Sequence, residues 1–413
     1  MTIPPGMRIL AVGNMYPPHH AGGYEVMWQA AMSRARELGH QVRVLTSEYR
    51  APTGAPETDP DVHRTLRWYW DLERYEFPAL SPLERVRIER HNARELARHL
   101  AEFRPHVVSW WSMGAMSLSL VERVRRLGIP AVFVVHDDWL IYGQQFDQWM
   151  RMWRGARMLL SPAAERLLGL PTTVHLMSAG KFVFNSRYTR EGAIAKGVEA
   201  DRAKVVYPGI EVSLLQELAP RAWQWRLLYI GRVDRQKGID TAVRALDHLP
   251  APATLEIWGT GDERYVAEMR RLAERLNVGN RLRFRGWAGP EDRLSAYARA
   301  DAVVFPVRWK EPFGLVPLEA MRVGRPVVST AQGGSAEFLQ DGDNALICAP
   351  DDPTALADAV MRLEGDEQLR EHLRDGGLRT AAHYTVDRFA EETVAEIVSA
   401  AGSSSEKRPS AVA

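Results

Sequence analysis

The sequence predicts an α/β protein made of two doubly wound domains that face each other across a cleft. The length of 413 residues suits two domains of about 200 residues each. Short apolar runs alternate with segments of helical periodicity through both halves, a pattern typical of parallel sheets covered by helices on both faces. The chain is 46% hydrophobic and 25% charged, which is typical of soluble globular proteins and excludes disordered and fibrous classes.

The first half begins with an apolar run at residues 7–13, which ends in a glycine and predicts a buried parallel strand. Helical spacing follows over residues 24–38, and Gly39 supplies a stop signal. A long amphipathic helix is expected over residues 82–103. The other strands expected in this half are residues 41–47, 107–111, 131–135, 181–185 and 204–207.

The second half repeats this rhythm. We place the domain boundary at residue 215, because the helical pattern breaks around Pro220, between residues 214 and 225. The polar tail, residues 401–413, is predicted to be disordered. The strands expected in the second domain, residues 216–385, are 226–233, 254–258, 281–286, 302–306, 326–330 and 345–348.

The charge balance and the single cysteine narrow the function classes. The formal net charge is +1, from 53 basic and 52 acidic side chains, so no nucleic-acid partner is expected. Cys348 is the only cysteine, which excludes an intrachain disulfide and a cysteine-rich metal site. The N-terminal residues show no cleavable leader, and no window of 18 apolar residues occurs, so we expect a cytoplasmic protein.

The segment KEPFGLVPLEAM, residues 310–321, follows an expected strand and runs through a turn into a helix near Val316. Glu311 and Glu319 would supply two acceptors for the hydroxyls of a sugar or ribose. The alternative is a surface helix after an ordinary turn. Backbone N–H groups left free to bind an oxygen-rich ligand would be those of Phe313, Gly314 and Leu315.

The segment GRVDRQKG, residues 231–238, joins an expected strand to the next helix. Arg232 and Lys237, together with the helix N-terminus, would form a pyrophosphate site. Neither G-x-G-x-x-G nor G-x-x-x-x-G-K-[ST] occurs here, and an exposed basic turn is the alternative. Lysine is rare in this chain, which favours the functional interpretation.

Two further candidates lie in the first half. Gly22 and Gly23, after the first strand, would let the backbone approach a phosphate or sugar, whereas His19 and His20 are interpreted as loop residues without metal ligands nearby. His136 follows the strand at residues 131–135, and its neutral imidazole would bond a sugar hydroxyl, with a structural cap as the alternative. No serine elbow or H-x-x-x-H helix supports a catalytic triad or a metal site.

Together these segments resemble the retaining, GT-B-fold glycosyltransferases of family 4, also called group 1. The run from Glu311 to Glu319 resembles the family's E-x7-E motif, and the glycine turns at residues 259–262 and 333–337 are similar to those of the family. The resemblance covers nearly the whole second domain and the start of the first. Two departures leave the donor open: Ser335-Ala336 replaces the common Ile-Pro, and YPGIE, residues 207–211, replaces a segment that usually contains Pro-Asn-Gly-Val-Asp.

The resemblance implies two Rossmann-like domains, with residues 1–215 on the acceptor side and residues 216–385 binding the nucleotide sugar. It implies that the helix at residues 386–400 packs back on the first domain. It also implies a role for each site residue: the donor diphosphate would be bound by Arg232 and Lys237, the ribose by Glu319, the sugar hydroxyls by Glu311 and the backbone of residues 313–315, the phosphate side by Gly22 and Gly23, and the sugar near its reacting carbon by His136.

The implied reaction is retaining transfer of a hexosyl group from a nucleoside diphosphate sugar, with uridine diphosphate (UDP) favoured by family frequency, to a hydroxyl of a saccharide, glycolipid or small-molecule acceptor. The favoured mechanism in the family is same-face attack, in which the leaving phosphate takes the acceptor's proton. Neither Glu311 nor Asp138 is therefore assigned as a nucleophile. No metal or other cofactor is expected, because the two cations would neutralise the leaving group.

The acceptor side is less determined. The first domain is rich in tryptophan, especially at residues 66–70, 110–111 and 139–153. These rings would form a sugar platform, rest peripherally on the inner face of a membrane, or simply pack in the core. A nucleotide-sugar epimerase and a non-catalytic nucleotide-sugar-binding relative are the competing classes, and a dehydrogenase is disfavoured for want of the glycine fingerprint.

Overall fold

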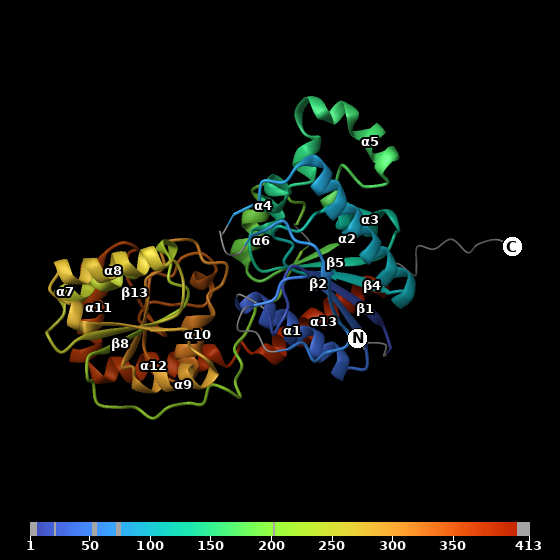
Figure 1. Cartoon of the computed structure of the whole chain (residues 1–413). Helices are drawn as coiled ribbons and strands as arrows, with labels where there is room; N and C mark the ends of the chain where they lie inside the picture. Colours follow the sequence, from blue (N-terminus) through green and yellow to red (C-terminus); the bar gives the residue numbers. More distant parts are fainter. Residues whose placement is uncertain (1–5, 20–21, 52–55, 72–75, 201–202, 403–413) are drawn as a thin grey trace. The chain divides into compact units, whose positions relative to one another are not determined.

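The computed structural model describes residues 6–19, 22–51, 56–71, 76–200 and 203–402, which form two α/β units (Figure 1). The first unit holds the described residues up to Tyr207 together with those from Asp387 onward, and the second is Pro208–Val386. Ile210 accounts for the difference from the expected boundary at residue 215. Its N–H donates to the Tyr384 carbonyl at 2.9 Å, and it accepts from the Val386 N–H at 3.1 Å, so this segment belongs to the second unit. His20 and residues 403–413 of the expected tail lie outside the described residues.

The first unit is built on a seven-stranded sheet of order β3-β2-β1-β4-β5-β6-β7, in which all neighbours are parallel. From β1 the chain adds β2 and β3 on one side, and then crosses over to add β4 and the later strands on the other side. In parallel sheets, ligands commonly bind at such a switch point, here at the carboxyl ends of β1 and β4. The strands are β1 Arg8–Gly13, β2 Gln41–Ser47, β3 Val62–Leu66, β4 Val107–Trp110, β5 Ala131–Val135, β6 Lys181–Phe184 and β7 Lys204–Val205.

Local sequence signals explain how the helices of this unit begin. At the start of α2, Ser81 accepts a hydrogen bond from the Glu84 N–H at 3.3 Å, and the Glu84 carboxylate accepts one from the Ser81 N–H at 2.7 Å. Pro82 occupies the first helical position, where no backbone donor is needed. The helices are α1 Gly23–Glu37, α2 Pro82–Phe103, α3 Ser119–Arg126, α4 Trp139–Phe146, α5 Ser161–Leu168, α6 Arg187–Ile194 and α13 Val386–Gly402, with 3₁₀ helices η1 Met150–Trp153, η2 Gly155–Leu160 and η3 Leu176–Ser178.

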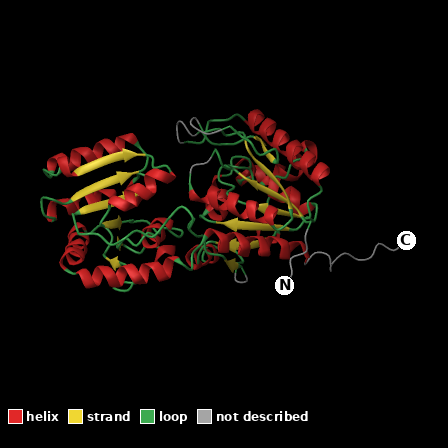
Figure 2. Ribbon diagram, turned by 90° about the horizontal axis from the view of Figure 1, so that it is seen from below, coloured by secondary structure: helices red, strands yellow, loops and turns green. Residues whose placement is uncertain are grey.

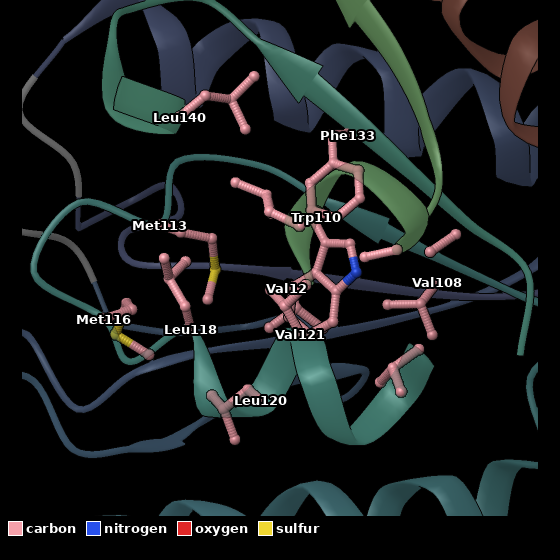
Figure 3. Packing of buried hydrophobic residues seen from close by; sticks show 14 of the residues in the cluster. Val12, Val108, Trp110, Met113, Met116, Leu118, Leu120, Val121, Phe133 and Leu140 are labelled. Carbon is pink, nitrogen blue, oxygen red and sulfur yellow. The ribbon is translucent and has the colours of Figure 1, made fainter. Parts of the chain in front are cut away.

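The core of the first unit forms where the central strands meet α3 (Figure 3). Trp110 of β4 and Phe133 of β5 stack with ring centroids 6.3 Å apart. Four of the tryptophans that the sequence singled out are fully buried: Trp110, Trp111, Trp139 and Trp149. Of the three roles considered for these rings, core packing is therefore the one that their burial supports.

The second unit has a six-stranded parallel sheet of order β10-β9-β8-β11-β12-β13, with helices on both sides of it (Figure 2). Here the switch point lies between β8 and β11. The strands are β8 Arg226–Ile230, β9 Thr254–Trp258, β10 Leu282–Gly286, β11 Ala302–Phe305, β12 Val327–Ser329 and β13 Leu346–Ile347. The helices are α7 Ile239–His248, α8 Glu263–Arg275, α9 Pro290–Arg299, α10 Leu315–Arg322, α11 Pro353–Gly365 and α12 Glu367–Ala381, with 3₁₀ helices η4 Arg235–Lys237, η5 Gly279–Arg281 and η6 Gly334–Glu337.

Candidate functional site

The candidate site of the second unit lies at the carboxyl ends of β8 and β11, where the strand order reverses. β8 ends at Ile230 and is followed by the loop that carries Arg232 and Lys237. β11 ends at Phe305 and is followed by the segment that carries Glu311. The fold therefore brings the two segments predicted from the sequence to the same edge of the sheet.

Lys237 is buried and forms an ion pair at this edge with Glu311, which is partly buried. The Lys237 Nζ atom lies 2.5 Å from Glu311 Oε2, and only 8% of Lys237 is exposed. The Trp309 indole N–H donates to the same carboxylate oxygen at 2.8 Å, and its ring lies 5.5 Å from Nζ. A buried ammonium group is costly unless a carboxylate accompanies it, so each charge holds the other in place.

Close backbone packing sets the position of Lys237. Asp234 accepts a hydrogen bond from the Gln236 N–H at 3.0 Å and begins the turn η4. Gly238 then adopts a φ of +67°, and a Cβ atom there would lie 1.9 Å from the Pro306 carbonyl oxygen. Only glycine permits this approach. The loop after β8 is thereby pressed against the end of β11, which places Lys237 beside Glu311.

Arg232 is placed differently from Lys237. Its side chain is 54% exposed, and its Nη1 atom lies 3.6 Å from Asp234 Oδ2. The sequence predicted that both cations converge on one phosphate site. The structure pairs Lys237 with Glu311 and leaves the Arg232 guanidinium at the surface of the same loop.

The N-terminus of α10, at Leu315, follows Glu311 after a three-residue turn. Gly314 precedes the helix with a φ of +92°, and no side chain caps this end. The glycine turn after β12 packs on the same segment, because the Gly334 N–H donates to the Glu311 carbonyl at 2.7 Å. The side chain of Phe313 is buried against Phe338 and Tyr384. This helix start has no side-chain cap, and the role of Gly314 and Leu315 as donors stays a prediction.

Glu319 lies on α10 and is held by two side chains of α9 that the sequence analysis missed. Arg293 Nη1 donates to Glu319 Oε1 at 2.9 Å, and the Tyr297 hydroxyl donates to Oε2 at 2.8 Å. Burial raises the pKa of Tyr297 well above its ordinary value, so the phenol remains a donor. The spacing of four residues between Arg293 and Tyr297 was visible in the sequence, but their partner on another helix was not.

His136 lies at the carboxyl end of β5 in the first unit and is enclosed by aromatic rings. Tyr24 stacks on it with centroids 4.6 Å apart, and Phe389 of α13 meets it edge-on at 5.2 Å. Burial lowers the pKa of His136 to about 3, so the imidazole is neutral at physiological pH. Its Nε2 atom is buried and has no hydrogen-bond partner among the described residues. A buried polar atom of this kind requires an explanation, and a ligand hydroxyl is one.

The neighbours of His136 do not form a catalytic dyad with it. Asp137 accepts hydrogen bonds from the Trp139 N–H at 3.0 Å and from the Tyr142 hydroxyl at 3.1 Å. Burial raises the pKa of Asp137 to about 6. The carboxylate is thus occupied by the start of α4 and is not directed at the imidazole.

Gly22 and Gly23 lie at the start of α1, and both are exposed. The Gly22 N–H donates to Glu25 Oε2 at 2.9 Å, which closes the first turn of the helix. His19 is a buried loop residue whose Nδ1 atom accepts from the Ala51 N–H at 3.2 Å. The Gly22 N–H is thus engaged within the helix start, and the contact of the two glycines with a phosphate or sugar stays a prediction.

The described ranges hold neither a cluster of metal-ligating side chains nor a membrane-spanning helix. Within those ranges, no three His, Cys, Asp or Glu side chains gather closely enough to hold a metal ion. No helix among the described residues has the length and apolar character needed to cross a bilayer.

Both units are similar to known proteins. Residues 215–379 match the family model for glycosyl transferases group 1, and residues 21–214 match the model for glycosyltransferase family 4. A glycosyltransferase of Methanocaldococcus jannaschii is 26% identical, with 94% of this chain and 97% of the relative covered. The glycogen synthase of Mycobacterium tuberculosis is 27% identical, with 87% of this chain and 86% of the relative covered.

The fold agrees with this assignment. The crystal structure of HepE from Anabaena, in complex with UDP and glucose, matches with a TM-score of 0.68 at 20% identity, and the match covers 94% of this chain and 99% of HepE. The family resemblance drawn from the sequence is confirmed. The chain belongs to the glycosyltransferases of the group 1 and family 4 type, and its two parallel-sheet domains are those of the GT-B fold.

Proposed function

We propose that this glycosyltransferase moves a hexosyl group from a UDP-sugar to a hydroxyl of a saccharide, glycolipid or small-molecule acceptor, with retention of the anomeric configuration. The observation that carries the proposal is the ion pair between the buried Lys237 and Glu311 at the switch point of the second sheet. It supplies a cation for a diphosphate and a carboxylate for sugar hydroxyls within one hydrogen-bond length. HepE, crystallised with UDP and glucose, supports the choice of nucleotide.

The proposed binding of the donor follows from charge. When the donor diphosphate arrives, its oxygens compete with Glu311 for Lys237, and Arg232 adds a second positive charge from the same loop. The released Glu311 carboxylate then accepts hydrogen bonds from hydroxyls of the donor sugar. Glu319 accepts from the ribose, using lone pairs that Arg293 and Tyr297 leave available.

The proposed chemistry needs stabilisation of a leaving diphosphate while the sugar becomes oxocarbenium-like. Lys237 and Arg232 provide it as fixed charges, which need not reorganise during the reaction. The acceptor oxygen attacks from the face that the phosphate leaves, and a phosphate oxygen takes the acceptor's proton. The neutral His136 contributes a hydrogen bond to a sugar hydroxyl and bears no charge in this scheme.

We also propose that no metal ion takes part, because two side-chain cations balance the leaving group. The experiment is a panel of nucleoside diphosphate sugars incubated with candidate acceptors, in parallel with and without EDTA. Release of UDP unaffected by EDTA, with a product whose anomeric proton coupling matches the donor's, is expected. Inverted product, or activity lost in EDTA and restored by manganese, would contradict the retention or the metal-free proposal respectively.

A further inference from the structure

The segment from η2 to α5 exposes an apolar surface that the folded unit does not cover. Met158, Leu159 and Leu160 are 63%, 84% and 63% exposed, and Leu167 on α5 is 83% exposed. The turn η2 has no buried residue at all. Figure 1 shows α5 standing clear of the rest of the first unit. Three consecutive exposed apolar side chains indicate a surface that binds an apolar partner.

The two ends of this segment are held by hydrogen bonds to the rest of the first unit. The exposed apolar side chains between them, Met158, Leu159, Leu160 and Leu167, are called the apolar tip below. The hydroxyls of Ser161 and Thr172 lie 2.6 Å apart, and both residues are buried. Glu165 accepts from the Thr172 N–H at 3.0 Å and pairs with Arg126 of α3. The Trp149 indole N–H donates to the Pro171 carbonyl at 2.6 Å. The fold thus holds the apolar tip outward on an anchored stem.

The charges around the tip are almost entirely positive. Residues 150–168 contain four arginines and a single glutamate, Glu165, which is already paired with Arg126. The arginine side chains that flank the apolar residues are exposed: Arg151, Arg154, Arg157 and Arg166. Long cationic side chains beside exposed leucines match a surface with an apolar interior and an anionic outer layer.

We propose that residues 150–168 dock the protein on a bilayer containing anionic phospholipids. Met158, Leu159, Leu160 and Leu167 enter the boundary between headgroups and acyl chains, and the flanking arginines contact the phosphates. An anionic bilayer is favoured over a protein partner because it presents acyl chains and phosphates together, which match exposed leucines beside exposed arginines. The proposal concerns attachment alone and does not depend on the donor or on the reaction.

The test is flotation of the purified full chain with vesicles of phosphatidylcholine, with and without phosphatidylglycerol. The chain is expected to float with the phosphatidylglycerol vesicles only, and less at high salt, because counter-ions screen the arginines. The double variant Arg157→Glu/Leu159→Asp should lower the partition coefficient about tenfold or more. The matched control is Met361→Asp/Arg362→Glu, which changes an exposed apolar residue and an exposed arginine on α11.

All four substituted side chains are exposed, so both variants are expected to keep the melting temperature of the parent. The proposal is overturned if the parent chain fails to float, if it floats equally with phosphatidylcholine alone, or if both variants lose binding alike. A parent that sediments as a dimer without vesicles, and becomes a monomer on Arg157→Glu/Leu159→Asp, would show instead that the tip joins two copies of the chain.

Discussion

At the scale of single residues, Lys237 depends on Glu311 because its ammonium group is buried and needs a carboxylate partner. Their contact joins residues 74 positions apart, so the pair is a product of the fold. In the free protein Glu311 satisfies the ammonium group, and in our proposal the donor diphosphate takes its place. Lys237 can therefore keep its positive charge before the substrate binds, because Glu311 accompanies the buried ammonium group.

The first prediction concerns this cation. Lys237→Met should lower kcat about a hundredfold, because one fixed charge on the leaving diphosphate is lost. The control is Lys310→Met, which removes an exposed lysine next to Glu311 and should leave kcat within about twofold. Steady-state rates of UDP release compare the two. Equal rates in Lys237→Met and the parent would remove Lys237 from the diphosphate site.

The second prediction concerns pH. His136 has its pKa lowered by burial from 6.5 to about 3, so the unfolded chain gains a proton at this residue before the folded chain does. Its contribution to stability is complete above pH 6.5 and is lost as the pH falls toward 3. The measurement is the free energy of unfolding in urea at several pH values. The difference between the parent and His136→Asn should be constant above about pH 7 and should decline by up to about 1 kcal/mol per pH unit below it. A difference independent of pH would show that His136 is accessible to protons.

At the scale of elements, the contact between the start of α7 and the end of β11 positions the loop that carries Arg232 and Lys237. Gly238→Ala should destabilise the protein by roughly 2–4 kcal/mol, since it adds a backbone clash to a left-handed conformation. Gly342→Ala is the control, because Gly342 has a φ of +74° but nothing within 4 Å of a Cβ atom. That change should cost about 1 kcal/mol, the price of the conformation alone. Urea unfolding measures both, and equal losses would mean that the clash at Pro306 relaxes freely.

The sequence predicted strands that are buried on both faces, such as β5, and also the half-exposed edge strand β10, but it missed β3. Strands such as β5, which is apolar throughout, stand out because a central parallel strand has no solvent side. β3 was missed because it is an edge strand in which His63 and Thr65 alternate with buried residues. The site was predicted as residue types at strand ends. Their partners, such as Trp309, Tyr297 and Phe389, could not be predicted, because no local pattern specifies which side chains meet across elements.

At the scale of the whole molecule, the proposed donor contacts of Lys237, Glu311 and Glu319 all belong to the second unit. UDP should therefore raise the melting temperature of the second unit more than that of the first. At a nucleotide concentration of 100 times Kd, the gain is about 2.7 kcal/mol, or roughly 5–10 °C for a unit of this size. Differential scanning calorimetry resolves the transitions, and Lys237→Met should show a reduced shift. A shift confined to the first unit would place the nucleotide elsewhere.

The last helix gives the first unit a discontinuous sequence. α13 follows the whole second unit in the chain, yet its Phe389 packs against the His136 ring. During synthesis on a ribosome, the second unit therefore emerges complete while the first still lacks a wall of its core. Until α13 is made, the His136 ring can meet Tyr24 and Trp111 but lacks its contact with Phe389. The contact between Phe389 and His136 is therefore made only after the second unit has been synthesised, and it depends on the last described helix of the chain.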